Sequence, residues 1–350
     1  MTTTAPPPTG VYAPEPWLSD LWLNTWWEHF GRAGRRCTFD LPPWGEPLPL
    51  LCERRYGLRR LRALGGASQR LALRCPAADL GHAVPALAAA LARRRDWDWL
   101  ELDRLLLPQA RTLAQALAGA GLRADCAAAV WQRFIPLDRP WARIAACWQP
   151  SMVRQLAAKE RALRRLGSLE LETVTAPVPA AARFEECLRL EAAGWKGREG
   201  TAMLSVPAKA AFYRALVPRL AAAGCLRLNL LLLNQRLLAF ACNTLQDGVE
   251  AGIKTGYDES PAWRRLSPGN ILKLLVLTRA HAEGLVEYDL LGGEDAYKAD
   301  WTPHFRELAR LRAFNLTGRA RAAVLVLQCR RRSRHHGACG SPAPSAPSSF

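Results

Sequence analysis

The chain has 350 residues, a length that favours two domains on the usual scale of about 100 to 200 residues per domain. Hydrophobic residues make up 49% and charged residues 23%, proportions that exclude disordered and fibrous chains and predict a globular protein. The formal net charge is +17, but only six of the 48 basic residues are lysines, so the arginine excess of this Ala- and Leu-rich chain indicates a compositional bias and argues against a nucleic-acid partner.

Neither the cysteines nor the ends of the chain suggest a metal site, a disulfide framework or export. The ten cysteines are widely separated and form no C-x-x-C pair. The first residues lack a secretory signal, and polar residues interrupt the most apolar stretch, 225–242, so we expect no membrane span. We therefore predict a cytoplasmic protein without a bound metal. Residues 1–14 and 321–350, rich in Pro, Ser or basic residues, are expected to be disordered.

The first half of the chain, residues 15–148, alternates strand and helix patterns. Gly57 supplies a turn between two apolar runs, which predicts a hairpin. The predicted elements are the hairpin strands 47–57 and 58–66, a helix over 77–95, a strand over 99–107, a helix over 108–120 and a strand over 126–137.

The second half, residues 149–320, repeats that order after a long amphipathic helix over 150–166. The further predicted elements are strand 169–176, helices 180–193 and 208–223, strands 226–233, 237–245 and 249–257, helix 269–283, strand 286–292, helix 295–301 and strand 308–316. The repeated order predicts a mixed-sheet α/β fold built from two tandem copies of one unit. A single large α/β domain is the alternative.

Three blocks in the second half depart from the Ala/Leu/Arg background and hold three of the six lysines. The first, LEAAGWKGREGTAM, places Trp195, Lys196 and Thr201 around two glycines at the end of a helix. This pattern fits a simple glycine cap and loop. It equally fits a loop whose backbone approaches a substrate closely, so these three residues are candidate substrate-binding residues.

The second block runs from Lys254 to Asn270, and its SPGN segment predicts the start of a helix, with Ser267 as the N-cap and Pro268 in the first turn. Uncovered backbone amides at such a start attract phosphate, although most capped helices bind nothing. Position favours a site, because ligands of open α/β folds bind beyond the strand ends. The candidates for cofactor binding are Lys254, Ser267, Pro268, Gly269 and Asn270; Tyr257 is a candidate for substrate binding, and Asp258 for catalysis.

The third block, YDLLGGEDAYKADWTP, follows a strand with two glycines and a short helix that places Glu294, Tyr297 and Lys298 on one face. A capped surface helix with a Glu–Lys pair is the alternative interpretation. The candidate substrate-binding residues of this block are Asp289, Gly292, Gly293, Lys298 and Trp301, and its candidate catalytic residues are Tyr297 and Glu294.

The motifs LE…WKG..GTA, K.GYDE…SPG and D.LGG.E.YK..W resemble the C-terminal domain of GNAT-superfamily acetyltransferases associated with cellulose and exopolysaccharide biosynthesis, the CelD/BcsL type, which are related to FemAB-like transferases. The N-terminal WL…WWEHFG, residues 17–31, is also similar. The resemblance implies two tandem GNAT-like acyltransferase units, with the catalytic cleft chiefly in the second. It also implies acetyl-CoA or another acyl-CoA as co-substrate.

In GNAT proteins coenzyme A lies between two splayed parallel strands, here 249–257 and 286–292, with its pyrophosphate on the amides of the next helix. The usual Gln/Arg-x-x-Gly-x-Gly/Ala cradle is absent, and only Gly269 remains of it. The resemblance makes Tyr297 the general acid that protonates the thiolate. Asp258, Glu294 and Asp289 are candidate bases, and such a carboxylate would need burial to raise its pKa toward neutrality.

The function predicted from the sequence is acyl-CoA-dependent N- or O-acyl transfer to a sugar, a polysaccharide precursor or an amino-containing metabolite. One alternative is a FemAB-like transferase that uses aminoacyl-tRNA as donor. The other is a non-catalytic GNAT scaffold in envelope-polymer synthesis, which the thinned glycine cradle supports.

Overall fold

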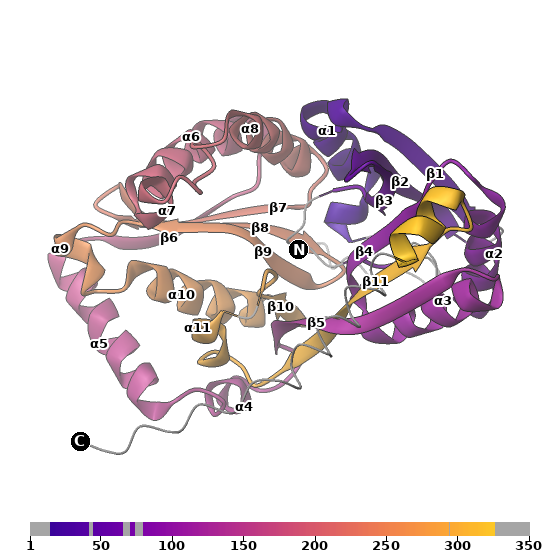
Figure 1. The fold of residues 1–350 in the computed structure, drawn as a ribbon. Helices are drawn as coiled ribbons and strands as arrows, with labels where there is room; N and C mark the ends of the chain where they lie inside the picture. Colours follow the sequence, from indigo (N-terminus) through magenta and orange to yellow (C-terminus); the bar gives the residue numbers. More distant parts are fainter. Residues whose placement is uncertain (1–14, 42–44, 66–70, 74–79, 294, 326–350) are drawn as a thin grey trace, which may run out of the picture.

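The computed structural model describes residues 15–41, 45–65, 71–73, 80–293 and 295–325, which form one mixed sheet with helices on both faces (Figure 1). The strands are β1 (Arg35–Leu41), β2 (Gly45–Arg55), β3 (Leu58–Ala63), β4 (Trp99–Leu106), β5 (Arg123–Pro136), β6 (Leu169–Val174), β7 (Leu226–Leu233), β8 (Arg236–Gln246), β9 (Val249–Tyr257), β10 (Glu287–Asp289) and β11 (Phe305–Phe314). The helices are η1 (Pro16–Leu18), α1 (Asp20–Phe30), η2 (Gly31–Ala33), α2 (Leu80–Arg93), α3 (Leu107–Gly119), α4 (Trp141–Ala145), α5 (Pro150–Leu166), α6 (Pro177–Ala193), α7 (Trp195–Arg198), α8 (Pro207–Ala222), α9 (Pro261–Arg264), α10 (Pro268–Ala282) and α11 (Ala296–Ala299).

The order of strands across the sheet shows that the two halves of the chain exchange strands. It runs β1-β2-β3-β4-β11-β5-β10-β9-β8-β7-β6. Each half has an antiparallel meander that ends beside a parallel strand, β4 next to β3 and β10 next to β9. The free edge of β4 is filled by β11 from the second half, and that of β10 by β5 from the first. The predicted mixed α/β fold is confirmed. The domain boundary at 148/149 stays a prediction, and both halves contribute strands to the one sheet.

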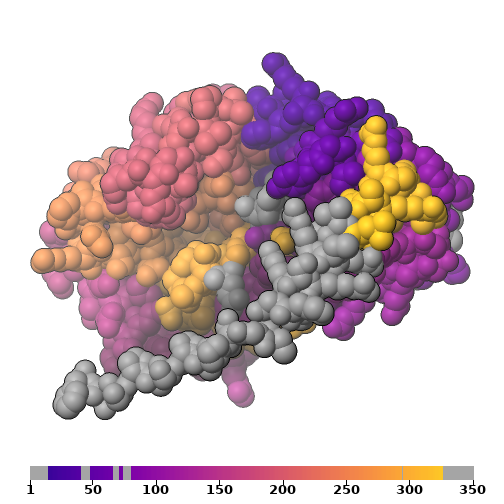
Figure 2. All heavy atoms as spheres, in the orientation of Figure 1, coloured from indigo at the N-terminus to yellow at the C-terminus, as the bar shows by residue number. Residues whose placement is uncertain are grey.

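Helices cover the sheet in both halves. On the second half α6 and α8 lie on one face and α10 and α11 on the other (Figure 1). Helix α1 packs against α8, where the indigo and salmon surfaces meet in Figure 2. In this contact the Trp22 ring lies edge-on to that of Phe212, with their centroids 5.8 Å apart. Among the helices of the described segments, none has both the length and the apolar character that a bilayer crossing needs.

The predicted strands and helices are confirmed in type and order, apart from shifts at their ends. Three two-residue turns take left-handed conformations that suit a twisted hairpin, at 56–57, 234–235 and 247–248. Helix α1 and strand β1 are not predicted from the sequence, and the loop expected around Lys196 contains the short helix α7. Residues 318–325, which include the start of the expected disordered tail, are helical; residues 1–14 and 326–350 lie outside the described part.

The predicted strand 286–292 is too long, because β10 ends at Asp289. Leu291 (φ 42°) and Gly292 (φ 66°) turn the chain through left-handed conformations. The carboxylate of Asp289 accepts a hydrogen bond from the Leu291 amide at 2.8 Å and so holds the turn. The Asp289 side chain thus takes the place of the next backbone hydrogen bond between the strands.

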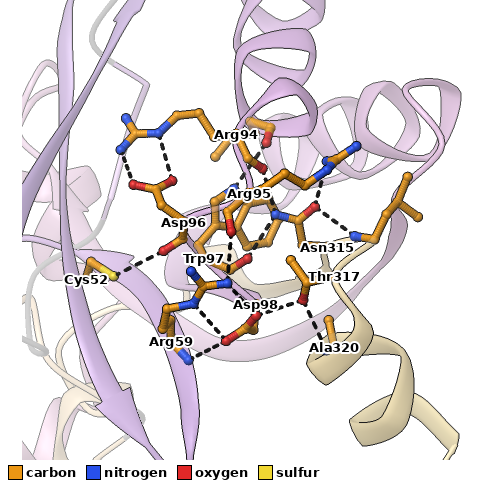
Figure 3. A network of polar contacts seen from close by, with 12 residues as sticks. Cys52, Arg59, Arg94, Arg95, Asp96, Trp97, Asp98, Asn315, Thr317 and Ala320 are labelled. Carbon is orange, nitrogen blue, oxygen red and sulfur yellow. Dashed lines mark hydrogen bonds and ion pairs between the residues drawn. The ribbon is translucent and has the colours of Figure 1, made fainter.

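The end of the exchanged strand β11 is fixed by a buried carboxylate, Asp98, at the start of β4 (Figure 3). Arg59 donates to it through both Nε (3.1 Å) and Nη2 (2.9 Å), and Thr317, just after β11, donates at 2.7 Å. Asn315 donates to the carbonyls of Arg94 and Trp97, each at 2.9 Å. Burial opposes the charge of Asp98, yet the bonds from Arg59 and Thr317 lower its pKa to about 2.

We expect Asp98→Asn to lower the free energy of unfolding by about 3 kcal/mol, because it leaves the Arg59 guanidinium without its buried partner. Since the pKa of Asp98 is depressed in the folded state, this stabilisation is present above about pH 4 and is lost as the pH falls toward 2. Urea unfolding followed by circular dichroism between pH 3 and 7 measures it.

Asp96→Asn is the matched control, because Asp96 binds Arg35 and Arg94 with 39% of its side chain exposed. It should cost less than about 1 kcal/mol. Equal losses for the two variants would show that the buried network does not hold the exchanged strand.

Candidate functional site

The parallel strands β9 and β10 pair over only three residues and then separate. The paired residues are 249–251 in β9 and 287–289 in β10. Strand β9 continues to Tyr257, whereas the chain turns away after Asp289. The strands therefore diverge at their carboxyl ends, the position at which open α/β sheets bind ligands.

Helix α10 begins beside this divergence, and its first turn differs from the sequence prediction. Ser267 occupies the N-cap position in a left-handed conformation (φ 51°), but its hydroxyl does not cap the helix; it accepts a hydrogen bond from Lys159 of α5 at 2.8 Å. The amide of Ser267 donates to Arg264 and that of Asn270 to Ser267, so these two are not uncovered. Pro268 has no amide hydrogen.

Gly269 is the position in this turn where an amide remains for a ligand, because no acceptor for it is found among the described residues. The ring of Tyr257, at the end of β9, packs on Gly269, where a Cβ atom would lie 3.0 Å from Tyr257 Cδ1. The glycine thus permits the strand end and the helix start to touch. Burial raises the pKa of Tyr257.

Lys273 lies four residues beyond Gly269 on α10, and therefore on the same helix face. Its Nζ is 4.6 Å from the centroid of the Tyr297 ring and 5.0 Å from that of Trp301. Within the described segments no carboxylate forms an ion pair with it, and burial lowers its pKa to about 7, with a further contribution from Lys298. Lys273 is not among the site residues predicted from the sequence, although its four-residue spacing from Gly269 on one helix indicates a shared face.

Tyr297 projects from α11 with 51% of its surface exposed and its ring beside Lys273. Partial desolvation, with smaller contributions from Asp295 and Tyr257, raises the pKa of Tyr297 to about 12. The phenol is therefore protonated at neutral pH. That is the state a proton donor requires.

Lys298 and Trp301 are buried and hold the loop after β10. Lys298 Nζ donates to the carbonyls of Leu291 (2.7 Å) and Gly293 (3.0 Å) and pairs with Asp295 at 2.7 Å. A Cβ at Gly292 would lie 2.9 Å from this amine. The carbonyl of Trp301 accepts a hydrogen bond from Trp148 at 2.8 Å. These contacts indicate that Lys298 and Trp301 shape the loop that presents Tyr297.

Of the predicted carboxylate bases, Asp258 does not meet the condition of a raised pKa. Burial of Asp258 favours a raised value, but hydrogen bonds from Ser260 and Arg236 lower its pKa overall. Asp289 is fully buried and accepts a hydrogen bond from Arg306 at 3.1 Å. Glu294, together with its expected pairing to a lysine, lies outside the described residues.

Lys254 lies on the opposite face of the sheet from α10, since its Nζ is 5.2 Å from the ring centroid of Tyr213 on α8. Burial lowers the pKa of Lys254. The structure thus does not bring this predicted cofactor ligand to the turn at 267–270.

The block around Trp195 lies at the end of β9. Lys196 Nζ donates to the buried Glu191 and to the carbonyl of Thr255, each at 2.8 Å, and Thr201 donates to the carbonyl of Lys196 at 3.3 Å. Glu259, which the sequence analysis does not single out, accepts a hydrogen bond from the Trp195 amide at 3.0 Å and joins this block to the residue after Asp258. Trp195 itself is 42% exposed.

Residues 150–299 match the family model described as an acetyltransferase (GNAT) domain. A comparison with curated proteins finds no match.

Among solved structures, the chain is similar to FemX, with a TM-score of 0.57, 13% identity and coverage of 85% of this chain and 92% of that one. It is similar to the C-terminal domain of a protein described as a lysylphosphatidylglycerol synthetase from Agrobacterium fabrum (TM-score 0.52, 13% identity, coverage 86% and 94%) and to L-PGS from Bacillus licheniformis (0.52, 10%, 92% and 99%). Identities of this size show a common fold. Within residues 150–299 the fold is that of a GNAT acetyltransferase domain.

We expect the Lys273 amine to titrate near pH 7, so that it is protonated below this pH and neutral above it. Brief labelling with acetic anhydride between pH 5 and 10, followed by mass spectrometry of the peptide that contains Lys273, measures the midpoint. A midpoint near the ordinary lysine value of about 10.4 would show that the amine is solvated and has no special role.

Proposed function

We propose that the protein is an acyl-CoA-dependent N- or O-acyltransferase of the CelD/BcsL type, which acts in the cytoplasm on a sugar, a polysaccharide precursor or an amino-containing metabolite. The observation that carries the proposal is the divergence of β9 and β10 beside the start of α10. The acceptor classes follow from the resemblance to exopolysaccharide-associated enzymes.

Three features at the start of α10 suit the diphosphate of a bound acyl-CoA. The Gly269 amide has no acceptor among the described residues, and the helix dipole adds partial positive charge. Lys159 places its amine 2.8 Å from the Ser267 hydroxyl and so adds a full charge at the same turn. This set replaces the missing glycine cradle with one amide and one lysine.

Two groups on α10 and α11 can move the protons that acyl transfer requires. Lys273, with its pKa of about 7, is neutral often enough at neutral pH to accept a proton from the attacking amine or hydroxyl. Tyr297, with its pKa of about 12, keeps the proton that the departing thiolate needs. Lys273 thus takes the role for which Asp258, Glu294 and Asp289 are candidates from the sequence.

Aminoacyl transfer from tRNA is the second candidate, and the likeness of fold to FemX over 85% of the chain favours it. The divergent strands would then receive the aminoacyl end of the tRNA in place of the thioester. A non-catalytic scaffold is the third candidate, supported by the pairing of amides in the first turn of α10.

Acetyl-CoA and longer acyl-CoAs should raise the melting temperature of the protein by mass action. Gly269→Trp should abolish this shift, because a side chain there meets Tyr257 and fills the turn. Thermal shift and calorimetry measure acyl-CoA binding, and retention on immobilised tRNA measures tRNA binding. Together they distinguish the three candidate functions.

The control for this experiment is Gly119→Trp at the end of α3, where a Cβ meets nothing within 4 Å. It should leave the shift intact. Retention by tRNA without any response to acyl-CoA would favour the second candidate, and no response to either would favour the scaffold.

Tyr297→Phe should lower kcat by about 100-fold or more while acyl-CoA binding changes little, since it removes a proton donor and keeps the ring against Lys273. Steady-state kinetics and calorimetry give the two numbers. Equal losses in both would indicate that the tyrosine serves packing alone.

A further inference from the structure

The exposed face of the first half of the sheet carries a groove of about 750 Å³, on the side opposite the α2 and α3 core. Its described lining includes six arginines, three carboxylates and the indole rings of Trp26 and Trp99. This volume lies in the range of about 300 to 1,000 Å³ that ligand pockets occupy. No role in the proposed acyl-CoA site accounts for it.

The three carboxylates bind four of the arginines in a ladder across β2, β3, β4 and β11. The pairs are Arg60 and Arg62 with Glu53, Arg60 and Arg312 with Glu101, and Arg310 with Asp103. Arg310 and Arg312 use Nε for these bonds and are 46% and 43% exposed. Among the described residues their Nη groups have no hydrogen-bond partner, which leaves a fork of donors that suits a carboxylate or a phosphate.

The other two arginines, Arg55 and Arg104, have no carboxylate partner within the described part of the chain. Arg55, at the end of β2, donates to the Tyr56 hydroxyl at 3.3 Å. Arg104 donates to the carbonyl of Gly292 at 2.6 Å. With six arginines against three carboxylates, the described lining of the groove carries an excess of positive charge.

Arg104 owes its position to a bulge in β4. The register between β4 and β11 shifts between Ala309 and Leu311, and Arg104 takes a left-handed conformation (φ 61°). Such a conformation is strained in a residue other than glycine, and bulges of this kind re-aim side chains next to binding sites. Here the bulge directs a half-buried guanidinium to Gly292, in the loop that presents Tyr297.

We propose that this arginine groove binds an acidic saccharide, holding its carboxylate or phosphate groups on Arg55, Arg310 and Arg312, while Arg104 marks the end of the groove that adjoins the transfer site. The assignment of this ligand as the acceptor rests on the proposed acyltransferase function. The proposal that the groove binds an anion does not depend on that function. The forked donors, the indole rings and the contact of Arg104 with Gly292 together favour a ligand that extends from the groove toward Tyr297.

Calorimetry on the full chain without acyl-CoA tests the proposal with three probes: trigalacturonic acid, glucose 1-phosphate and uncharged maltotriose. We expect one or both anions to bind at least about tenfold more tightly than maltotriose, and more weakly as salt is raised. The two anions separate a carboxylate from a phosphate as the recognised group. Equal affinity for all three probes, or binding of none, overturns the proposal.

Arg55→Ala and Arg54→Ala form a matched pair, because these neighbours on β2 carry the same charge and point to opposite faces. Arg55→Ala should weaken anion binding by about tenfold, as expected for one lost charged hydrogen bond. Arg54→Ala should leave it unchanged. Equal losses of anion affinity in the two variants would show that only net charge matters, and would overturn the proposal that the groove is the binding site.

Arg310→Gln serves as a second variant that keeps a polar side chain on the ladder, and it should weaken anion binding without altering acetyl-CoA affinity. If the protein binds the anion but does not bind acyl-CoA, the groove is still an anion site, whereas the acyltransferase proposal is contradicted. Binding of tRNA in place of either anion, with the same dependence on Arg55, would overturn the saccharide assignment.

Discussion

The exchange of β5 and β11 between the two halves is the constraint on which the rest of the structure depends. Neither parallel strand, β4 or β10, has a neighbour of its own half on its outer edge, so an isolated half would expose unpaired backbone groups there. The exchange also requires long-range pairing, since β11 reaches β4 across about 200 residues of chain. The buried carboxylate of Asp98 binds groups before and after this pairing, Arg59 and Thr317, and thereby fixes the far end of β11.

The same exchange reaches the proposed transfer site through the other end of β11. Arg306 donates to Asp289 at 3.1 Å and to Glu287 at 2.5 Å, so the incoming strand neutralises the two acidic residues of β10. Asp289 in turn holds the turn at Leu291 that separates β10 from β9. Arg306, seventeen positions after Asp289 in the sequence, therefore stabilises the divergence of the parallel strands. This coupling explains why a three-residue strand is sufficient at the centre of the sheet.

Local signals in the sequence predict most of the elements, and the exchange is what they cannot predict. Apolar periodicity and the Asn234 and Asp247 turns are local properties, and the corresponding strands and hairpins are found. Helix α1 has a signal of the same kind, a Ser19 cap followed by apolar residues at helical spacing. Pairing partners are set by burial across the whole chain. The sequence could therefore not show that Lys254 faces α8, or that the Asp258 carboxylate is held charged by Arg236.

The positions of the arginines in the fold, and not their number in the sequence, indicate where a ligand could bind. A net charge of +17 in an Arg-rich chain says little about partners, and many of the arginines pair with carboxylates in the fold, as Arg183, Arg214 and Arg279 do. Much of the basic character is thus neutralised locally, in ion pairs that lie apart from one another. What distinguishes the groove is the pair of arginines left without a carboxylate where a bulge turns one of them toward the loop after β10. Guanidinium groups gathered beside the proposed transfer site, two of them without an ion pair in the described structure, are a more specific indication of a ligand than the total charge of the chain.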